Sequence, residues 1–129
     1  MKQMRFFCTL SSFFLFYCVP LTETAEKLPP PSPIAPANNT AIRVADLKKC
    51  ERIQFRWSPV TNARGYEIET EYRESNGSWT STYEPRFVNT PQDAIKFCDR
   101  QTYRWRVYAY DARDKPGLKS QWFVLKTTT

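Results

Sequence analysis

Three glutamates at alternate positions are the residues whose type and spacing come nearest to an active site. Glu67, Glu69 and Glu71 lie in YEIETEYR, residues 66–73, where the alternation of residue types predicts an extended strand. Alternate residues of a strand lie about 6.6 Å apart, and glycosidases hold their two carboxyl groups at about this separation. Those enzymes also need a cleft and one carboxyl group with a raised pKa, whereas a strand face is flat and open. Because the chain also lacks histidine, we predict that it is not an enzyme and uses no cofactor.

The N-terminal segment has the charge pattern of a secretory signal peptide. Lys2 and Arg5 give it a positive start, residues 6–19 carry no charge, and residues 22–25 offer small side chains for cleavage. The uncharged run is shorter than the ~20 apolar residues that a transmembrane helix needs. We therefore expect residues 1–25 to be removed and the mature protein to be secreted or periplasmic.

Two alternatives would keep the chain on a membrane. An uncleaved signal would act as an anchor, and Glu23 is a poor residue two places before a cut after Ala25. A lipid anchor on Cys18 is the second alternative, although Tyr17 stands where bacterial lipoprotein signals usually carry a small residue. We expect no other contact with a membrane.

The charge of the chain is basic but dispersed. The 19 Lys and Arg residues exceed the 13 Asp and Glu residues, which gives a net charge of +6. The basic residues are scattered among acidic ones and form no run. This pattern predicts no nucleic-acid partner and only a general attraction to acidic surfaces.

Two cysteines remain once the N-terminal segment is set aside. Cys8 and Cys18 lie within residues 1–25, which leaves Cys50 and Cys98. An even number of cysteines in an exported chain predicts a disulfide. A metal site is the alternative, but the chain has no histidine and neither cysteine belongs to a CxxC pair, so the usual ligands of tetrahedral zinc are missing. We expect a Cys50–Cys98 disulfide and no bound metal.

Short strands and turns alternate along the rest of the chain. QTYRWRVYAYD, residues 101–111, is the clearest strand because its alternate residues are apolar, and we expect it at the centre of a sheet. Residues 85–91 are expected to be irregular. Turn residues recur about every ten positions without helical periodicity, which predicts an all-β sandwich. The other expected strands are 51–60, 66–73, 79–83, 94–98 and 120–126.

A proline-rich stretch, KLPPPSPIAPA, precedes the first of these strands at residues 27–37. Proline on an edge strand removes no ladder hydrogen bond, so we interpret this stretch as a lead-in that runs into the first edge strand. The expected organisation is a signal peptide over residues 1–25, a proline-rich lead-in over 26–33 and one domain over 34–127.

Several motifs follow one another in a recognisable order. The chain has PANNT at residues 36–40, FRWSPV at residues 55–60, and then Ala63, Tyr66, Tyr103, Val107 and Ala109. This order and spacing resemble a fibronectin type III domain of the kind found in exported and envelope proteins of bacteria. The resemblance covers about residues 30–127 and implies a seven-stranded, immunoglobulin-like β-sandwich.

The resemblance assigns structural roles to four residues. It implies that Trp57 fills the centre of the core and that Tyr103 is a corner tyrosine whose hydroxyl group reaches back to the backbone. Tyr66 and Val107 complete this core signature. The sequence departs from the pattern at Trp105, where a smaller aliphatic residue is usual, so the core must accommodate two tryptophans.

The disulfide is a second departure, because most such domains have none. In this fold the strands over 51–60 and 94–98 are antiparallel neighbours, so the start of one lies beside the end of the other. Both cysteines are out of phase with the inward residues of their strands, which implies that they share one outer face. A bridge between them would restrict the unfolded chain by about 4 kcal/mol.

The resemblance also makes the strands over 66–73 and 101–111 neighbours in the larger sheet. Their outer faces then set the three glutamates against two arginines, which keep the carboxylates ionised and form cross-strand pairs. One interpretation is a solvated, self-paired face. The alternative is a binding face, because Tyr, Trp and Arg dominate binding hot spots. Its candidate residues are Glu67, Glu69, Arg104, Arg106, Tyr108, Tyr110 and Trp122.

Ser120-Gln121-Trp122 resembles half of the W-S-x-W-S motif of cytokine receptors, whose tryptophans stack with arginines. Lys119 replaces the first tryptophan and Phe123 replaces the last serine. We interpret this partial match as coincidence.

These features predict an exported module that binds a protein or mediates adhesion, in the cell envelope or outside the cell. One alternative is a carbohydrate or cell-wall binding module, in which Trp79, Tyr83 and Trp122 would stack on sugar rings. The other alternative is a structural accessory of an envelope assembly, with the proline-rich lead-in as a spacer.

Overall fold

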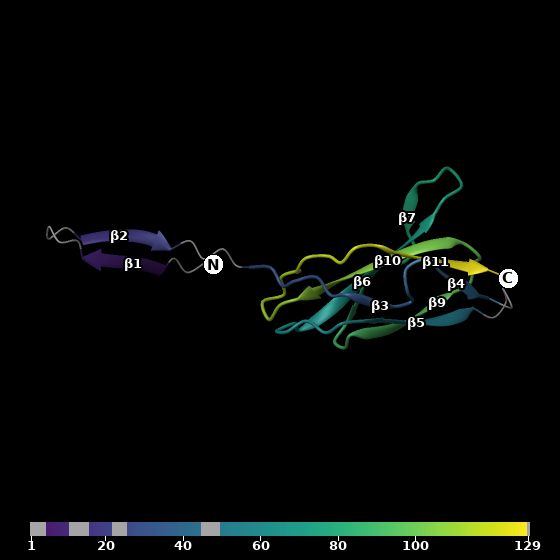
Figure 1. Ribbon diagram of the computed structural model, residues 1–129, viewed down its shortest axis with the longest axis horizontal. Helices are drawn as coiled ribbons and strands as arrows, with labels where there is room; N and C mark the ends of the chain where they lie inside the picture. Colours follow the sequence, from purple (N-terminus) through teal and green to yellow (C-terminus); the bar gives the residue numbers. More distant parts are fainter. Residues whose placement is uncertain (1–4, 11–15, 22–25, 45–49, 129) are drawn as a thin grey trace.

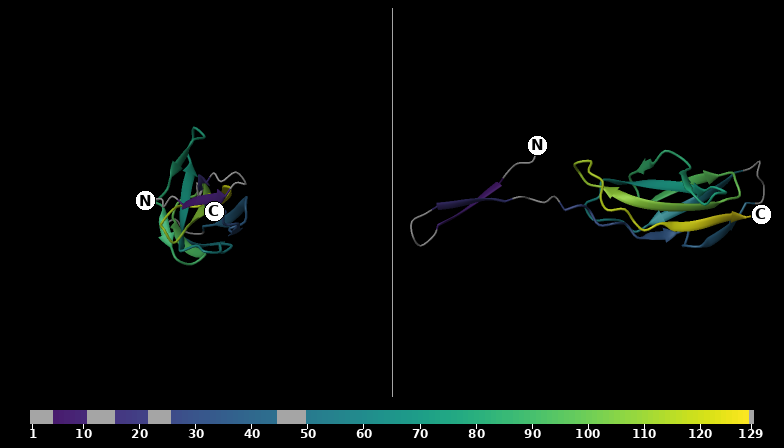
Figure 2. Two further views of the ribbon diagram at one scale, coloured as in Figure 1. Left: turned by 90° about the vertical axis from the view of Figure 1, so that its left-hand side faces the viewer. Right: turned by 90° about the horizontal axis from the view of Figure 1, so that it is seen from above.

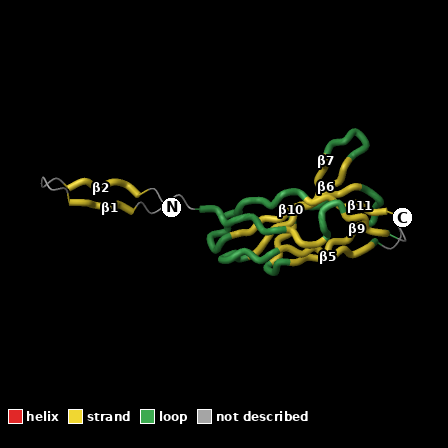
Figure 3. Tube along the Cα trace, in the orientation of Figure 1, coloured by secondary structure: helices red, strands yellow, loops and turns green. Residues whose placement is uncertain are grey.

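A computed structural model describes residues 5–10, 16–21, 26–44 and 50–128. Every regular element in these ranges is a β-strand, drawn yellow in Figure 3. The described residues accordingly include no helix that is long and apolar enough to cross a membrane. The all-β prediction is confirmed.

Two sheets pack face to face to form a sandwich (Figure 1 and Figure 2). The strands of the larger sheet run in the order β4-β11-β10-β6-β7, and β8 also pairs with β6. The strands of the smaller sheet run in the order β3-β5-β9. The larger sheet consists of β4 (Thr40–Arg43), β6 (Gly65–Arg73), β7 (Trp79–Ser81), β8 (Arg86–Val88), β10 (Thr102–Tyr110) and β11 (Phe123–Thr128). The smaller sheet consists of β3 (Pro33–Ala35), β5 (Glu51–Trp57) and β9 (Gln92–Phe97).

An N-terminal hairpin lies apart from this sandwich (Figure 1). It consists of β1 (Arg5–Leu10) and β2 (Phe16–Leu21), which pair antiparallel with Arg5 opposite Leu21. This pairing does not test the signal-peptide prediction for residues 1–25. The expected cleavage position after Ala25 lies outside the described residues.

The strand predictions need three corrections. The expected first strand is divided between the two sheets: β3 pairs with β5, whereas β4 runs parallel to β11. Residues 85–91 are not entirely irregular, because β8 pairs with the part of β6 that β7 leaves open. The last strand begins at Phe123 rather than Ser120, because the residues before Phe123 are held against β10 by a hydrogen bond to the side chain of Ser120 and not by a continuous strand ladder.

The core lies between the two sheets and is rich in aromatic rings. Trp57 and Trp105 are both buried there with ring centroids 6.5 Å apart, as the sequence required. Trp105 also packs edge-on against Phe55 at 5.0 Å. Neither indole N–H finds an acceptor among the described residues, which is a cost of placing two indoles in one apolar core. The core cluster comprises Ile53, Phe55, Trp57, Tyr66, Ile68, Ile95, Phe97, Tyr103, Trp105, Val107, Ala109 and Leu125.

Two buried tyrosines of the core form hydrogen bonds with backbone groups through their hydroxyl groups. The Tyr103 hydroxyl donates to the carbonyl of Asp99 at 3.3 Å, which is the contact expected of a corner tyrosine. Burial raises the pKa of Tyr103 from 10.0 to about 12. The Tyr66 hydroxyl accepts a hydrogen bond from the Val60 amide at 2.9 Å. Both tyrosines belong to the core cluster.

A disulfide joins the end of β9 to the start of β5. In the antiparallel register Glu51 lies opposite Phe97, so the next pair outward is Cys50 and Cys98. Their Cα atoms are 4.1 Å apart and their sulfur atoms are bonded. The predicted Cys50–Cys98 bridge is confirmed.

Candidate functional site

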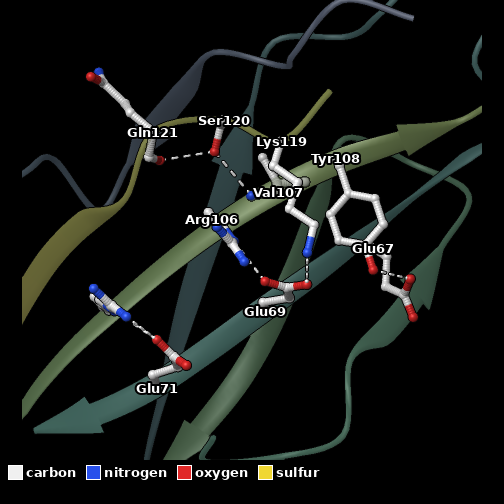
Figure 4. A network of polar contacts seen from close by, with 10 residues as sticks. Glu67, Glu69, Glu71, Arg106, Val107, Tyr108, Lys119, Ser120 and Gln121 are labelled. Carbon is white, nitrogen blue, oxygen red and sulfur yellow. Dashed lines mark hydrogen bonds and ion pairs between the residues drawn. The ribbon is translucent and has the colours of Figure 1, made fainter. Parts of the chain in front are cut away.

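Antiparallel pairing of β6 and β10 sets the predicted glutamates and arginines against one another. The register places Arg104 opposite Glu71 and Arg106 opposite Glu69. Arg104 Nη2 lies 2.5 Å from Glu71 Oε1. Arg106 Nε lies 2.6 Å from Glu69 Oε2 (Figure 4). These side chains share the outer face because alternate strand residues point the same way. We call this surface the ladder face; it consists of Glu67, Glu69, Glu71, Trp79, Arg104, Arg106, Tyr108, Tyr110, Lys119 and Trp122.

Two tryptophans cover the arginines of the ladder face. The guanidinium carbons of Arg104 and Arg106 each lie 4.1 Å from the Trp122 ring centroid. Arg104 also lies 4.4 Å from the centroid of Trp79. Each arginine therefore combines a carboxylate partner in the sheet with an aromatic partner above it. Such cation–π contacts fix the positions of both side chains.

The segment before β11 positions Trp122 by hydrogen bonds to β10. The Ser120 amide donates to the Val107 carbonyl at 2.9 Å, and the Val107 amide donates to Ser120 Oγ at 3.0 Å (Figure 4). Trp122 thus stacks on arginines, as the tryptophans of the W-S-x-W-S motif do. The interpretation of the partial match as a coincidence stays a prediction.

Tyr108 and Tyr110 both turn their hydroxyl groups to one carboxylate, that of Glu67. Burial raises the pKa of Tyr108, and its hydrogen bond to Glu67 raises it further. For Tyr110 the hydrogen bond to Glu67 is the largest of the influences that raise the pKa. Both phenols therefore stay protonated and act as donors.

Tyr108 presents little surface to a partner, although the sequence placed it on the candidate binding face. Its relative exposure is only 6%. Lys119 lies over its ring at 5.0 Å, and Lys119 Nζ also bonds Glu69 Oε1 at 2.7 Å (Figure 4). Sequence reasoning missed this role of Lys119, because the role depends on how the segment after β10 folds back.

Against the effect of burial, the basic side chains beside Glu69 lower its pKa, which is unfavourable for acid catalysis. Burial is the largest single influence and raises the pKa of Glu69, but the hydrogen bonds from Lys119 and Arg106 together outweigh it. The pKa of Glu69 is therefore lowered below its usual value of 4.5. A glycosidase acid needs the opposite shift. The described residues also contain no group of three or more potential metal-binding side chains.

The three aromatic residues proposed for sugar stacking do not form one platform. Trp79 and Trp122 each have Arg104 against a ring face. Tyr83 lies elsewhere: its ring packs on Phe97 at 6.3 Å and its hydroxyl donates to the carbonyl of Lys96. Tyr83 is therefore apart from the two tryptophans, and both tryptophans already contact a cation.

A second surface feature lies at one end of the sandwich, where sequence reasoning identified only turns. An open hollow forms there between residues 62–64 and 111–115. Arg64 Nη2 pairs with Asp114 Oδ1 at 2.5 Å, and its guanidinium lies 4.7 Å from the centre of the Phe87 ring. Asp111 accepts backbone hydrogen bonds from Lys115 and Arg113, which lower its pKa. These contacts shape the turn and occupy the carboxylates.

Comparison with known proteins gives structural neighbours but no sequence relatives. No family model matches the chain, and no curated protein matches it. An Fn3-like protein from Clostridium thermocellum is 13% identical, with a TM-score of 0.49, over 81% of this chain and 97% of that one. The fibronectin type III domain of human fibronectin type III domain containing protein 3 is 16% identical, with a TM-score of 0.50, over 82% of this chain and 91% of that one.

A larger protein contains a similar part. The β-1,2-glucanase from Parabacteroides distasonis is 14% identical, with a TM-score of 0.52, over 88% of this chain but only 15% of that one. At these identities the likeness concerns the fold alone. Together with the two-sheet arrangement, the likeness to the human domain shows that the chain has a fibronectin type III-like fold.

Proposed function

We propose that the chain is an exported, single-domain, fibronectin type III-like module that binds another protein through the ladder face, in the cell envelope or outside the cell. Residues 1–25 would be the signal peptide, residues 26–33 a lead-in and residues 34–127 the binding domain. The confirmed disulfide supports this location, because disulfides persist in oxidising compartments.

The position of Trp122 carries the proposal. Its ring is held over two arginines that are themselves bonded to glutamates of β6. The side chains are therefore fixed before a partner arrives, and less conformational freedom is lost on binding. Tryptophan and arginine are also the residue types that contribute most at protein interfaces.

A capture experiment with a matched control tests the binding face. The mature domain with Trp122→Ala and the domain with Tyr83→Ala are each used to capture proteins from extracts of the native host. Both changes remove an aromatic ring, but Tyr83 lies off the ladder face. We expect a protein that the unmodified domain and Tyr83→Ala retain and that Trp122→Ala loses. Equal retention by both variants would show that the ladder face is not the contact surface.

Export is tested separately by the intact mass of the protein from its native host, measured without reduction after free thiols are blocked. We expect a chain that starts near Glu26 and carries no blocked thiol. A full-length mass with blocked thiols would contradict both the cleavage and the compartment.

The glycan alternative has weaker support, because the stacking faces of Trp79 and Trp122 are engaged by Arg104. Tryptophan fluorescence that shifts with one member of a glycan panel would favour it over protein binding. The structural-accessory alternative predicts a large complex in size-exclusion chromatography of native extracts, with no small free species.

A further inference from the structure

The outer face of the smaller sheet carries basic side chains without acidic partners in the described part of the chain, unlike the ladder face. Residues of β5 and β9 alternate between buried and outward positions. The residues with outward parity include three basic side chains and no acidic one, and Glu51, which is exposed at the start of β5, has inward parity. We call this surface the cationic face; it consists of Arg52, Gln54, Arg56, Gln92, Ala94 and Lys96.

Strand register concentrates the positive charge of the cationic face. Arg52 lies directly opposite Lys96 in the antiparallel pair, an arrangement of like charges that destabilises a sheet. No ion pair joins either residue, or Arg56, to another described residue. This contrasts with Arg104 and Arg106, each of which has a carboxylate as its cross-strand partner.

The acidic residues nearest in sequence do not neutralise this face. Glu51 has the parity of the inward residues and lies opposite Phe97. Asp93 lies opposite Phe55, and its Oδ2 atom is 3.1 Å from Nε of Arg86. The carboxylate of Asp93 is therefore directed away from the outward cations. The described part of the smaller sheet thus retains an uncompensated positive face.

We propose that the cationic face binds an extended acidic segment of a polypeptide. The proposal goes beyond the ladder face and does not depend on it, because the two surfaces lie on opposite sides of the sandwich. A domain with both surfaces would hold two partners at once. The unmatched charges of Arg52, Arg56 and Lys96 are the feature that the acidic segment complements.

The other residues of the cationic face favour a polypeptide over a sugar polymer or a nucleic acid. Bases stack on aromatic side chains, and sugar rings do so as well, but the six residues of this face include no aromatic one. Gln54 and Gln92 instead supply side-chain amides, which both donate and accept hydrogen bonds as a peptide backbone does. An extended acidic chain matches both the charges and the amides.

Fluorescence anisotropy with a defined probe tests this proposal. The probe is a fluorescein-labelled peptide of alternating Glu and Ser residues, and a peptide of alternating Lys and Ser serves as the negative control. We expect the domain to bind only the acidic peptide, more tightly at low salt than at about 0.15 M, because salt screens exposed charges. The triple variant R52Q/R56Q/K96Q should bind roughly tenfold more weakly, since three exposed charge contacts are lost.

A matched variant separates a specific face from net charge. R113Q/K115Q/K126Q removes the same number of positive charges from exposed positions elsewhere, and we expect it to bind the acidic peptide within about twofold of the unmodified domain. The single variant Lys96→Gln provides a smaller perturbation of the same face, and thermal unfolding verifies that each variant folds.

Three results would overturn the proposal. The first is failure of the unmodified domain to bind the acidic peptide. The second is an equal loss in the two triple variants, which would indicate attraction by net charge alone. The third is binding to a sulfated polysaccharide or to anionic lipid vesicles without binding to the peptide, which would assign the face to another kind of partner.

Discussion

The two outer faces of the sandwich are formed by the same alternation of strand residues, yet within the ranges that the structure describes the charges are paired on one face and unpaired on the other. On the ladder face Arg106 has a glutamate opposite it and Trp122 above it. On the cationic face Arg52 has Lys96 opposite it and no ion-pair partner among the described residues. The comparison shows that alternation decides which residues reach a surface, whereas strand register decides whether their charges are compensated.

The faces also differ in what holds their strands together. The ladder face is fastened by ion pairs and stacked aromatic rings between β6, β10 and the segment before β11. The strands of the cationic face are joined instead by the Cys50–Cys98 disulfide at one end. Five predictions follow, from the largest expected effect to the smallest.

The largest effect is expected from the double variant C50S/C98S. The cysteines are 48 positions apart in sequence, and opening a loop of that size should lower the free energy of unfolding by about 4 kcal/mol. Denaturant unfolding measures the loss. Hydrogen exchange should quicken in β5 and β9 before β6 and β10, and a loss below ~1 kcal/mol would show that the disulfide does not hold the smaller sheet.

Trp122→Ala should lower the free energy of unfolding by about 2 kcal/mol, because it removes two cation–π contacts and a partly buried ring. Thermal and denaturant unfolding measure the change. Tyr83→Ala is the matched control on another surface. An unchanged stability in Trp122→Ala would mean that the stacking contributes nothing to the ladder face.

Glu69→Gln should cost about 1–1.5 kcal/mol, because Arg106 and Lys119 lose the carboxylate to which they both bond. The loss should depend on pH. The pKa of Glu69 is lowered in the folded chain, so its carboxylate stabilises the fold above pH ~4.5, and this contribution is lost as the pH falls through the folded pKa. Melting temperatures across the acid range should therefore slope less in Glu69→Gln, and a parallel slope would contradict the assignment.

At alkaline pH the stability of the fold should depend on a different residue, Tyr103. Burial raises the pKa of Tyr103 from 10.0 to about 12, so the stability that depends on its protonated hydroxyl is present below pH 10 and lost as the pH rises toward 12. Absorbance of the phenolate during alkaline titration follows this group. Tyr103→Phe should remove that component, and a phenolate signal unchanged by the substitution would assign it elsewhere.

The smallest effect should have the opposite sign. Lys96→Gln removes a like charge from opposite Arg52, so we expect a gain of a few tenths of a kcal/mol in unfolding free energy. The gain should shrink as salt is added, because the repulsion is exposed to solvent. A destabilised Lys96→Gln would mean that the charges of the cationic face are compensated after all.

The sequence predicted the features of the fold that depend on residue type and alternation. Trp57 and Tyr103 lie in the core as expected, and the cysteine count led to the right disulfide. That the glutamates of β6 face Arg104 and Arg106 of β10 also followed, although it required the resemblance to a known fold to make the strands neighbours; which arginine pairs with which glutamate depends on the register.

The sequence could not predict the features that depend on register or on irregular backbone. Tyr108 is buried because Lys119 folds over it from a segment without strand structure. Arg52 and Lys96 are far apart in the chain, and only the register of β5 against β9 makes them neighbours. The spacing R-x-Q-x-R over residues 52–56 was visible in the sequence, but it does not show that no acid lies opposite.

Site-specific photo-crosslinking in the native host tests the central claim, that the ladder face of the exported domain contacts a protein. A photoreactive phenylalanine analogue replaces Tyr110 on the ladder face or Tyr83 away from it, so that each change substitutes one aromatic ring for another. Our account predicts a discrete crosslinked protein for position 110 and none for position 83. An exported, folded chain that forms no crosslink from position 110 would contradict it.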